Sequence, residues 1–198
     1  MNKSLCCLLA AALLGGCGGL TRNVPPERIY VLSAAEAEGP AAVNAVLLLP
    51  RPVMQPGLDT DRIALAMPGH ELDYYAASRW GESLPKVVSA LAAQVLGGAG
   101  GFATVLGPDR SQVSGDFELL LTVRHFEART GSGDAPEAHV AFDCVLAAGL
   151  PRRVLGRCDG AATVPAAANR QGEIVAALES AARQALMQVR AGAVAAAR

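Results

Sequence analysis

Residues 116–128 read DFELLLTVRHFEA, a long stretch in which apolar side chains recur at every second position. This is the period of a strand that buries one face, here the face of Phe117, Leu119, Leu121 and Val123. Segment 137–149, EAHVAFDCVLAAG, alternates in the same way, and segment 153–164, RVLGRCDGAATV, follows after a short turn. The three segments predict consecutive long strands, the last two forming a hairpin.

The predicted hairpin brings two cysteines face to face. If its strands pair around Pro151, Cys144 lies directly opposite Cys158. Opposite Cβ atoms are about 4.5–5.5 Å apart in an antiparallel pair, and a disulfide needs about 3.5–4.5 Å, so a small local adjustment closes the bond. We therefore predict a Cys144–Cys158 disulfide. The alternative is two separate buried thiols, because a register slip of one residue would place them on opposite faces.

Two helices are predicted from apolar stripes at the helical period. Ser83 is the expected N-cap of the first, with Pro85 in its first turn, and the glycines of 97–101 end it. The second helix covers 169–192 with Asn169 as its N-cap, and residues 193–198 are expected to fray. The stripe of the first helix contains Trp80, Leu84, Val87, Val88, Leu91 and Val95, and that of the second contains Ile174, Leu178, Ala181, Ala185, Leu186 and Val189.

Shorter strands are expected at 28–34, 43–50, 62–68 and 103–107, and residues 69–75 read as a turn. Strands and helices that are not strictly alternating favour the α+β class. We expect one mixed or antiparallel sheet of about six or seven strands, with two amphipathic helices packed on one face. This single domain would span residues 28–192.

The start of the chain has the pattern of a bacterial lipoprotein signal. Lys3 precedes a ten-residue apolar run, which is too short for a membrane span of roughly 20 residues but fits a signal-peptide core. The following Leu-Gly-Gly-Cys ends at Cys17 and resembles the lipobox, in which the cysteine receives diacylglycerol and an acyl chain such as palmitate. We expect a signal peptide at 1–16 and a tether at 17–27. The alternative is an ordinary secretory signal with a chance cysteine.

Gly18 follows the cysteine. In enterobacterial lipoproteins an aspartate there favours retention in the inner membrane, so the outer membrane is expected for this chain, with the domain facing the periplasm. Cys6 and Cys7 would leave with the signal, which makes Cys144 and Cys158 an even pair in an oxidising compartment.

The charge pattern does not favour a nucleic-acid partner. The chain has 17 Lys and Arg against 18 Asp and Glu, a formal net charge of −1, and no basic block. The sequence therefore gives no reason to expect nucleic-acid binding.

No catalytic or metal-binding motif stands out. The three histidines, His70, His125 and His139, have no HExxH or CxxC context, so no metal site is predicted. Asp59 and Asp61 read as turn residues, and Trp80 reads as a core residue rather than a platform for a ligand. We expect a protein that is not an enzyme and has no cofactor other than the lipid on Cys17.

Segment 49–91 resembles the ABC-type transport auxiliary lipoprotein family, which includes the paraquat-inducible protein C group. The family pattern has a Pro-x-Leu-Asp element before a strand, an apolar-aromatic pair after a turn, and then Arg-Trp before the first helix. The positions that match the pattern are Pro56, Leu58, Asp59, Leu72, Tyr74, Arg79 and Trp80. The lipobox, the strand at 116–128 and the last helix extend the resemblance over nearly the whole mature chain.

The resemblance implies a non-catalytic periplasmic component of an ABC or MCE-type system that moves phospholipid or another hydrophobic solute across the envelope. Its partners would be MCE-domain proteins and an ABC permease and ATPase, and the family relation also suggests a homo-oligomeric ring. An exposed face of Pro52, Val53, Met54 and Tyr75 is the candidate partner contact, with ordinary surface packing as the alternative. Other readings are a structural lipoprotein of a surface or secretion assembly, and a tethered hydrolase.

Overall fold

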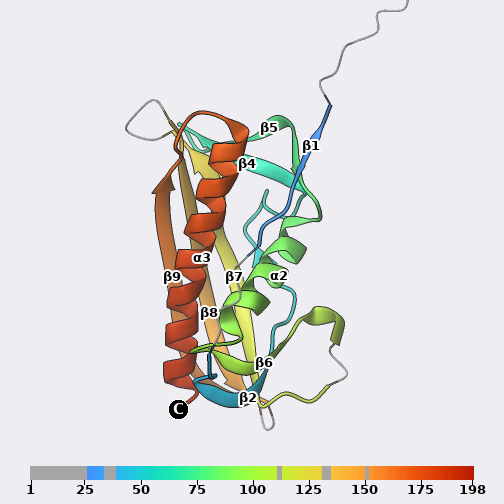
Figure 1. Ribbon diagram of the computed structural model, residues 1–198, viewed down its shortest axis with the longest axis vertical. Coiled ribbons are helices and arrows are strands. Elements are labelled where there is room, and N and C mark those ends of the chain that lie inside the picture. The colour runs from blue at the N-terminus through green and yellow to red at the C-terminus, as the bar shows by residue number, and fades with distance from the viewer. Residues whose placement is uncertain (1–25, 34–38, 111–112, 131–134, 150–151) are drawn as a thin grey trace, which may run out of the picture.

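The structure is a computed structural model, and it describes residues 26–33, 39–110, 113–130, 135–149 and 152–198. Two helices lie against the same face of a large sheet (Figure 1). The predicted signal peptide, Cys17 and most of the predicted tether lie outside the described residues.

Nine strands form one mixed sheet within the described residues. The elements are β1 (Arg28–Tyr30), β2 (Val43–Leu48), β3 (Val53–Met54), β4 (Arg62–Met67), β5 (Glu71–Trp80), α2 (Leu84–Leu96), β6 (Phe102–Leu106), the 3-10 turn η1 (Pro108–Arg110), β7 (Phe117–Arg129), β8 (Glu137–Ala148), β9 (Arg153–Pro165) and α3 (Gln171–Ala196). The α+β class and the two helices on one face are confirmed. The expected six or seven strands are corrected to nine.

Strand β7 is the centre of the sheet. One edge pairs with β8 along its length, and β8 in turn pairs with β9. The other edge takes three short parallel strands one after another: β2 at Phe117, β3 at Thr122 and β4 at Glu127. Strand β6 then continues the sheet from β2, and β5 and β1 continue it from β4. The long strand predicted at 116–128 therefore organises both halves of the fold.

The two additional strands are β3 and β5. Strand β3 has only two residues in a proline-rich segment, so its pattern is too short to be recognised. Strand β5 occupies the predicted turn and continues to Trp80, which is therefore not part of the first helix. Its alternation is interrupted by a bulge, where Ala77 has a φ of 51° and the pairing with β4 shifts. This interruption hides the two-residue period.

Trp80 is a core residue, as its apolar surroundings in the sequence predicted. It is 1 % exposed, and its ring meets that of Phe126 edge-on with 5.9 Å between centroids. The end of β5 is thereby fixed against the central strand β7.

Helix α2 begins and ends close to the predicted positions. Ser83 is at the N-cap, although its side chain makes no capping hydrogen bond, and Gly97 is at the C-cap. Helix α3 has Arg170 at its N-cap instead of Asn169 and continues to Ala196. Ala193 and Val194 are buried. The helix therefore extends into residues 193–198, where the sequence pattern predicted fraying.

Helix α3 packs on β9 through small side chains. Added Cβ atoms show how close the two elements are: one on Gly160 would collide with the backbone carbonyl of Ala185, and one on Gly192 would lie 2.6 Å from Cβ of Cys158. The side-chain amide of Gln188 accepts a hydrogen bond from the backbone N–H of Ala161 (3.1 Å) and donates one to its carbonyl (3.0 Å). The helix thus contacts both the face and the edge of β9.

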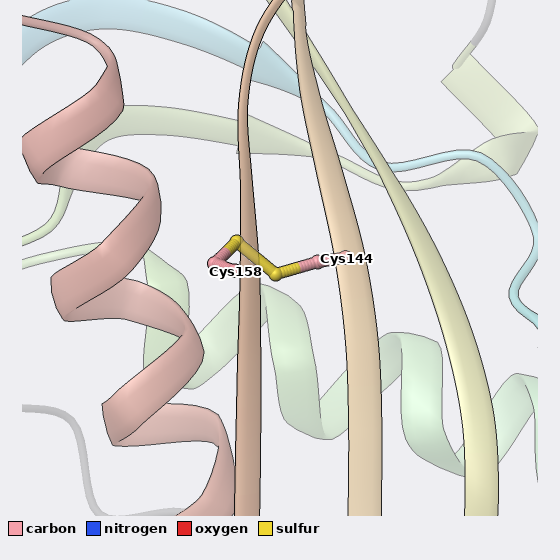
Figure 2. The surroundings of a disulfide bond; sticks show 2 residues. All are labelled: Cys144 and Cys158. Atoms are coloured by element: carbon pink, nitrogen blue, oxygen red, sulfur yellow. A yellow bond between two sulfur atoms is a disulfide. The ribbon is translucent and has the colours of Figure 1, made fainter.

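The disulfide predicted from the register is present in the structure. Cys144 pairs with Cys158 across β8 and β9, their Cα atoms are 5.0 Å apart, and the two sulfur atoms are bonded (Figure 2). The expected register holds from Glu137 to Leu146 and then shifts by a bulge. Alternation of the strands places the bond on the side of the sheet that α3 covers.

Reduction of this disulfide is expected to lower the free energy of unfolding by about 2–3 kcal/mol, because the bond closes a loop of roughly 15 residues in the unfolded chain. Urea unfolding with and without a reductant measures the effect. A Cys144→Ala/Cys158→Ala double variant is the control, since its unfolding should not respond to the reductant. Equal stability of the oxidised and reduced wild-type protein would contradict the expectation.

Candidate functional site

A bulge in β7 at Arg124 changes which side chains face the helices. Val123 pairs with Phe142 of β8, and the next pair joins His125 to Ala141, so no residue of β8 lies opposite Arg124 in the backbone register. Val123 is buried before the bulge and Phe126 after it. His125 and Glu127 consequently face the side of the sheet opposite the helices. Without the bulge, His125 would share the helix-facing side with Val123.

Three side chains meet on this helix-free side. Glu127 lies directly opposite His139 of β8, and His125 is two residues before Glu127 on the same strand. Oε1 of Glu127 lies 2.8 Å from Nδ1 of His125 and 3.4 Å from Nδ1 of His139. The two imidazole rings are 4.3 Å apart between centroids. We call these residues the His-Glu-His cluster.

Glu127 is the buried member of the cluster. The residue is only 6 % exposed, and its Oε2 accepts a hydrogen bond of 2.7 Å from the backbone N–H of Phe126. His139 is mostly buried and His125 is half exposed. Burial lowers the pKa of His139, with smaller contributions from the charges of Arg129 and His125, although Glu127 acts in the opposite direction. His139 is therefore biased toward its neutral form.

The His-Glu-His cluster lies in a cleft of about 550 Å³. The turn between β4 and β5 lines it with His70, whose φ is 67°, and the segment after β3 lines it with Pro56. All three histidines of the chain therefore line one cleft. The sequence hint of this site is the His-x-Glu spacing at residues 125–127. The spacing alone does not predict the site, because the cluster also depends on the bulge in β7 and on the register between β7 and β8.

The residues of the family pattern hold the segment after β3 in place. The hydroxyl of Tyr74 donates a 2.8 Å hydrogen bond to the carbonyl of Gly57, and the guanidinium of Arg62 lies 4.2 Å from the centre of the Tyr74 ring. Gly57 has a φ of 87°, and a Cβ there would lie 2.6 Å from Cδ2 of Leu72. Leu58 is buried. Glycine is favoured at residue 57 on both counts.

The two aspartates of this segment form ion pairs. Asp59 accepts a 2.8 Å hydrogen bond from Arg51, and Asp61 lies 3.4 Å from Arg79, which also binds Glu27 at 2.8 Å. These pairs connect the loop to its surroundings. The structural role expected for Asp59 and Asp61 agrees with this geometry.

The members of the predicted contact face, Pro52, Val53, Met54 and Tyr75, differ in how far they are buried. Pro52 is buried, and Met54 and Tyr75 are partly buried against the core. Burial also raises the pKa of Tyr75. Only Val53, at 64 % exposed, has a largely free side chain. The four residues therefore do not form one exposed face.

Strand β1 and the residue after it expose apolar side chains that no motif in the sequence marks. Ile29 is 57 % exposed and Val31, just after the strand, is 76 % exposed. Beside them, a cleft of about 350 Å³ is lined by Tyr30 and Leu32, and by Val87 of α2. This surface follows closely on the segment predicted to be the tether.

The chain is similar to one protein family and to solved structures. The model of the family described as "ABC-type transport auxiliary lipoprotein component" matches residues 30–190. The crystal structure of protein XCC0632 from Xanthomonas campestris, assigned to DUF330, is similar with a TM-score of 0.74 and 21 % identity, covering 86 % of this chain and 96 % of that one. The crystal structure of an uncharacterized protein has a TM-score of 0.62 and 14 % identity, covering 84 % and 97 %. No curated protein matches the chain.

The two solved structures show that the fold is shared over nearly the whole domain. Among the described residues, no helix is both long enough and apolar enough to cross a membrane.

Proposed function

Since the chain belongs to the ABC-type transport auxiliary lipoprotein family, we propose that it is a non-catalytic component of an ABC or MCE-type transport system, anchored by lipid on Cys17 and facing the periplasm. The solute would be a phospholipid or another hydrophobic molecule, and the outer membrane is the proposed site of the anchor. The observation that carries the proposal is the family match over residues 30–190.

Two further features support this proposal. The lipobox ending at Cys17 provides an attachment that confines the domain to one membrane surface. The sequence contains no nucleophile–base pair in a recognisable catalytic motif, and the family relation favours an auxiliary role. A protein of this kind acts by holding its partners near the membrane, so its surfaces carry the function.

Co-purification tests the proposal. The full chain with a C-terminal affinity tag, extracted from membranes in mild detergent, is expected to retain an ABC permease, its ATPase or an MCE-domain protein. An unrelated lipoprotein with the same tag is the matched control and should not retain them. Recovery of surface or secretion proteins in place of transport proteins would contradict the proposal.

A deletion strain provides the functional measurement. We expect the strain to be more sensitive to detergent and to accumulate phospholipid in the outer leaflet of the outer membrane. The wild-type gene should return both properties to normal. Normal lipid asymmetry together with normal detergent resistance would contradict a role in phospholipid transport.

A further inference from the structure

We propose that His125, Glu127 and His139 form a binding site for a first-row divalent transition-metal ion, with zinc as the preferred candidate. This site goes beyond the proposed transport role and does not depend on it.

The geometry of the His-Glu-His cluster suits a single metal ion. One ligand atom from each of the three side chains lies within 4.8 Å of the others. Zinc binds nitrogen and oxygen ligands at about 2.0–2.2 Å, so ligand atoms of a tetrahedral site lie roughly 3.3–3.5 Å apart. The 3.4 Å between Oε1 of Glu127 and Nδ1 of His139 already has this value. The 2.8 Å to Nδ1 of His125 must lengthen by about half an ångström, which its half-exposed side chain permits.

The ligand types also fit zinc. Two imidazoles and one carboxylate form a set that zinc sites use when they keep an open position, and imidazole nitrogen suits zinc, copper, iron and nickel. The open position would face the cleft. The ligands come from two paired strands, so the backbone holds them at fixed positions.

The surroundings of Glu127 favour a cation. A buried carboxylate needs a compensating charge or several hydrogen bonds. Oε2 of Glu127 accepts a hydrogen bond from the backbone N–H of Phe126, and this bond would also orient the carboxylate as a metal ligand. Oε1 of Glu127 faces the two histidines. A metal ion held between Oε1 and the two imidazoles would supply a compensating positive charge beside the buried carboxylate.

Two nearby arginines act against a bound cation. Arg124 and Arg129 both line the cleft. Arg124 is paired with Asp143 at 2.9 Å, which offsets its charge, and Arg129 donates a hydrogen bond of 3.3 Å to the hydroxyl of Thr163. Repulsion between these arginines and the metal ion lowers the affinity of the site. Direct ligation by three side chains acts in the opposite direction and favours binding.

Metal titration of the full chain tests the site. The protein is purified in detergent with a tag that contains no histidine, stripped with a chelator, and titrated with zinc chloride by calorimetry. We expect one equivalent bound with a dissociation constant in the micromolar range or below. Cobalt(II) should bind in its place and give the visible absorption of a low-coordinate nitrogen and oxygen site. Absence of binding at micromolar zinc overturns the proposal.

Matched variants locate the metal. His125→Gln removes a ligand whose side chain is 48 % exposed, so the fold should be retained, and the affinity should fall by at least the roughly 10–100-fold that loss of an outer-shell partner costs. Glu127→Gln should have the same effect. His70→Ala removes the third histidine of the same cleft and should leave the affinity unchanged within about twofold. An equal loss in His70→Ala, or no loss in His125→Gln, overturns the assignment.

Discussion

Serine in place of Cys17 is expected to move the protein almost completely from the membrane fraction to the soluble fraction. In the proposed lipoprotein the thiol of Cys17 receives diacylglycerol, and the hydroxyl of serine cannot replace it, so the variant would carry no acyl chain. Each buried methylene contributes about 0.8 kcal/mol of membrane affinity, and one chain gives only reversible binding whereas several anchor stably. Incorporation of labelled palmitate and fractionation of the cells measure the change.

The matched control for this experiment is Cys6→Ser. Cys6 lies within the predicted signal peptide, and its substitution should leave both palmitate incorporation and membrane attachment unchanged. Wild-type protein that incorporates no palmitate and is released by osmotic shock would contradict the lipid anchor. Loss of attachment in Cys6→Ser with attachment retained in Cys17→Ser would place the modification elsewhere.

Replacement of Trp80 by alanine is expected to lower the free energy of unfolding by about 3–5 kcal/mol, the usual cost of removing a buried aromatic side chain. Trp80 is 1 % exposed and contacts Phe126 edge-on, so its removal leaves a cavity where β5 meets β7. Trp80 is the only tryptophan, and urea unfolding must therefore be followed by circular dichroism rather than by fluorescence.

Two variants serve as controls for Trp80→Ala. Trp80→Phe keeps an aromatic ring and should recover a large part of the loss. Leu120→Ala removes a side chain of β7 that is 48 % exposed and should cost much less than Trp80→Ala. A loss in Trp80→Ala no larger than that in Leu120→Ala would show that the tryptophan is not part of the stabilising core.

The sequence pattern predicted the C-terminal half of the fold well. Strands β7, β8 and β9 are long, and their two-residue period continues for enough positions to be recognised. The predicted hairpin around Pro151 placed Cys144 opposite Cys158, and the observed register and disulfide confirm this pairing. The family resemblance, based on residues such as Leu58 and Tyr74, is confirmed by the family match.

The remaining parts depend on local irregularities that leave little trace in a sequence. The positive φ at Ala77 interrupts the two-residue period of β5. The sequence pattern therefore predicts Trp80 on the apolar stripe of the first helix, whereas it ends β5. The bulge at Arg124 turns His125 and Glu127 to the helix-free side, where the pairing of β7 with β8 brings His139 beside them. The three residues therefore come together through two features of the backbone, neither of which has a distinctive residue type.

The hydrogen bonds between Gln188 and Ala161 bear on how copies of this protein can associate. Strand β9 pairs only with β8 among the described residues, and an unpaired strand is a template for addition of a strand from another molecule. The amide of Gln188 occupies both backbone groups of Ala161, midway along β9. A strand of a second copy could pair with β9 past Ala161 only by displacing the Gln188 amide, so α3 partly protects this edge against extension of the sheet.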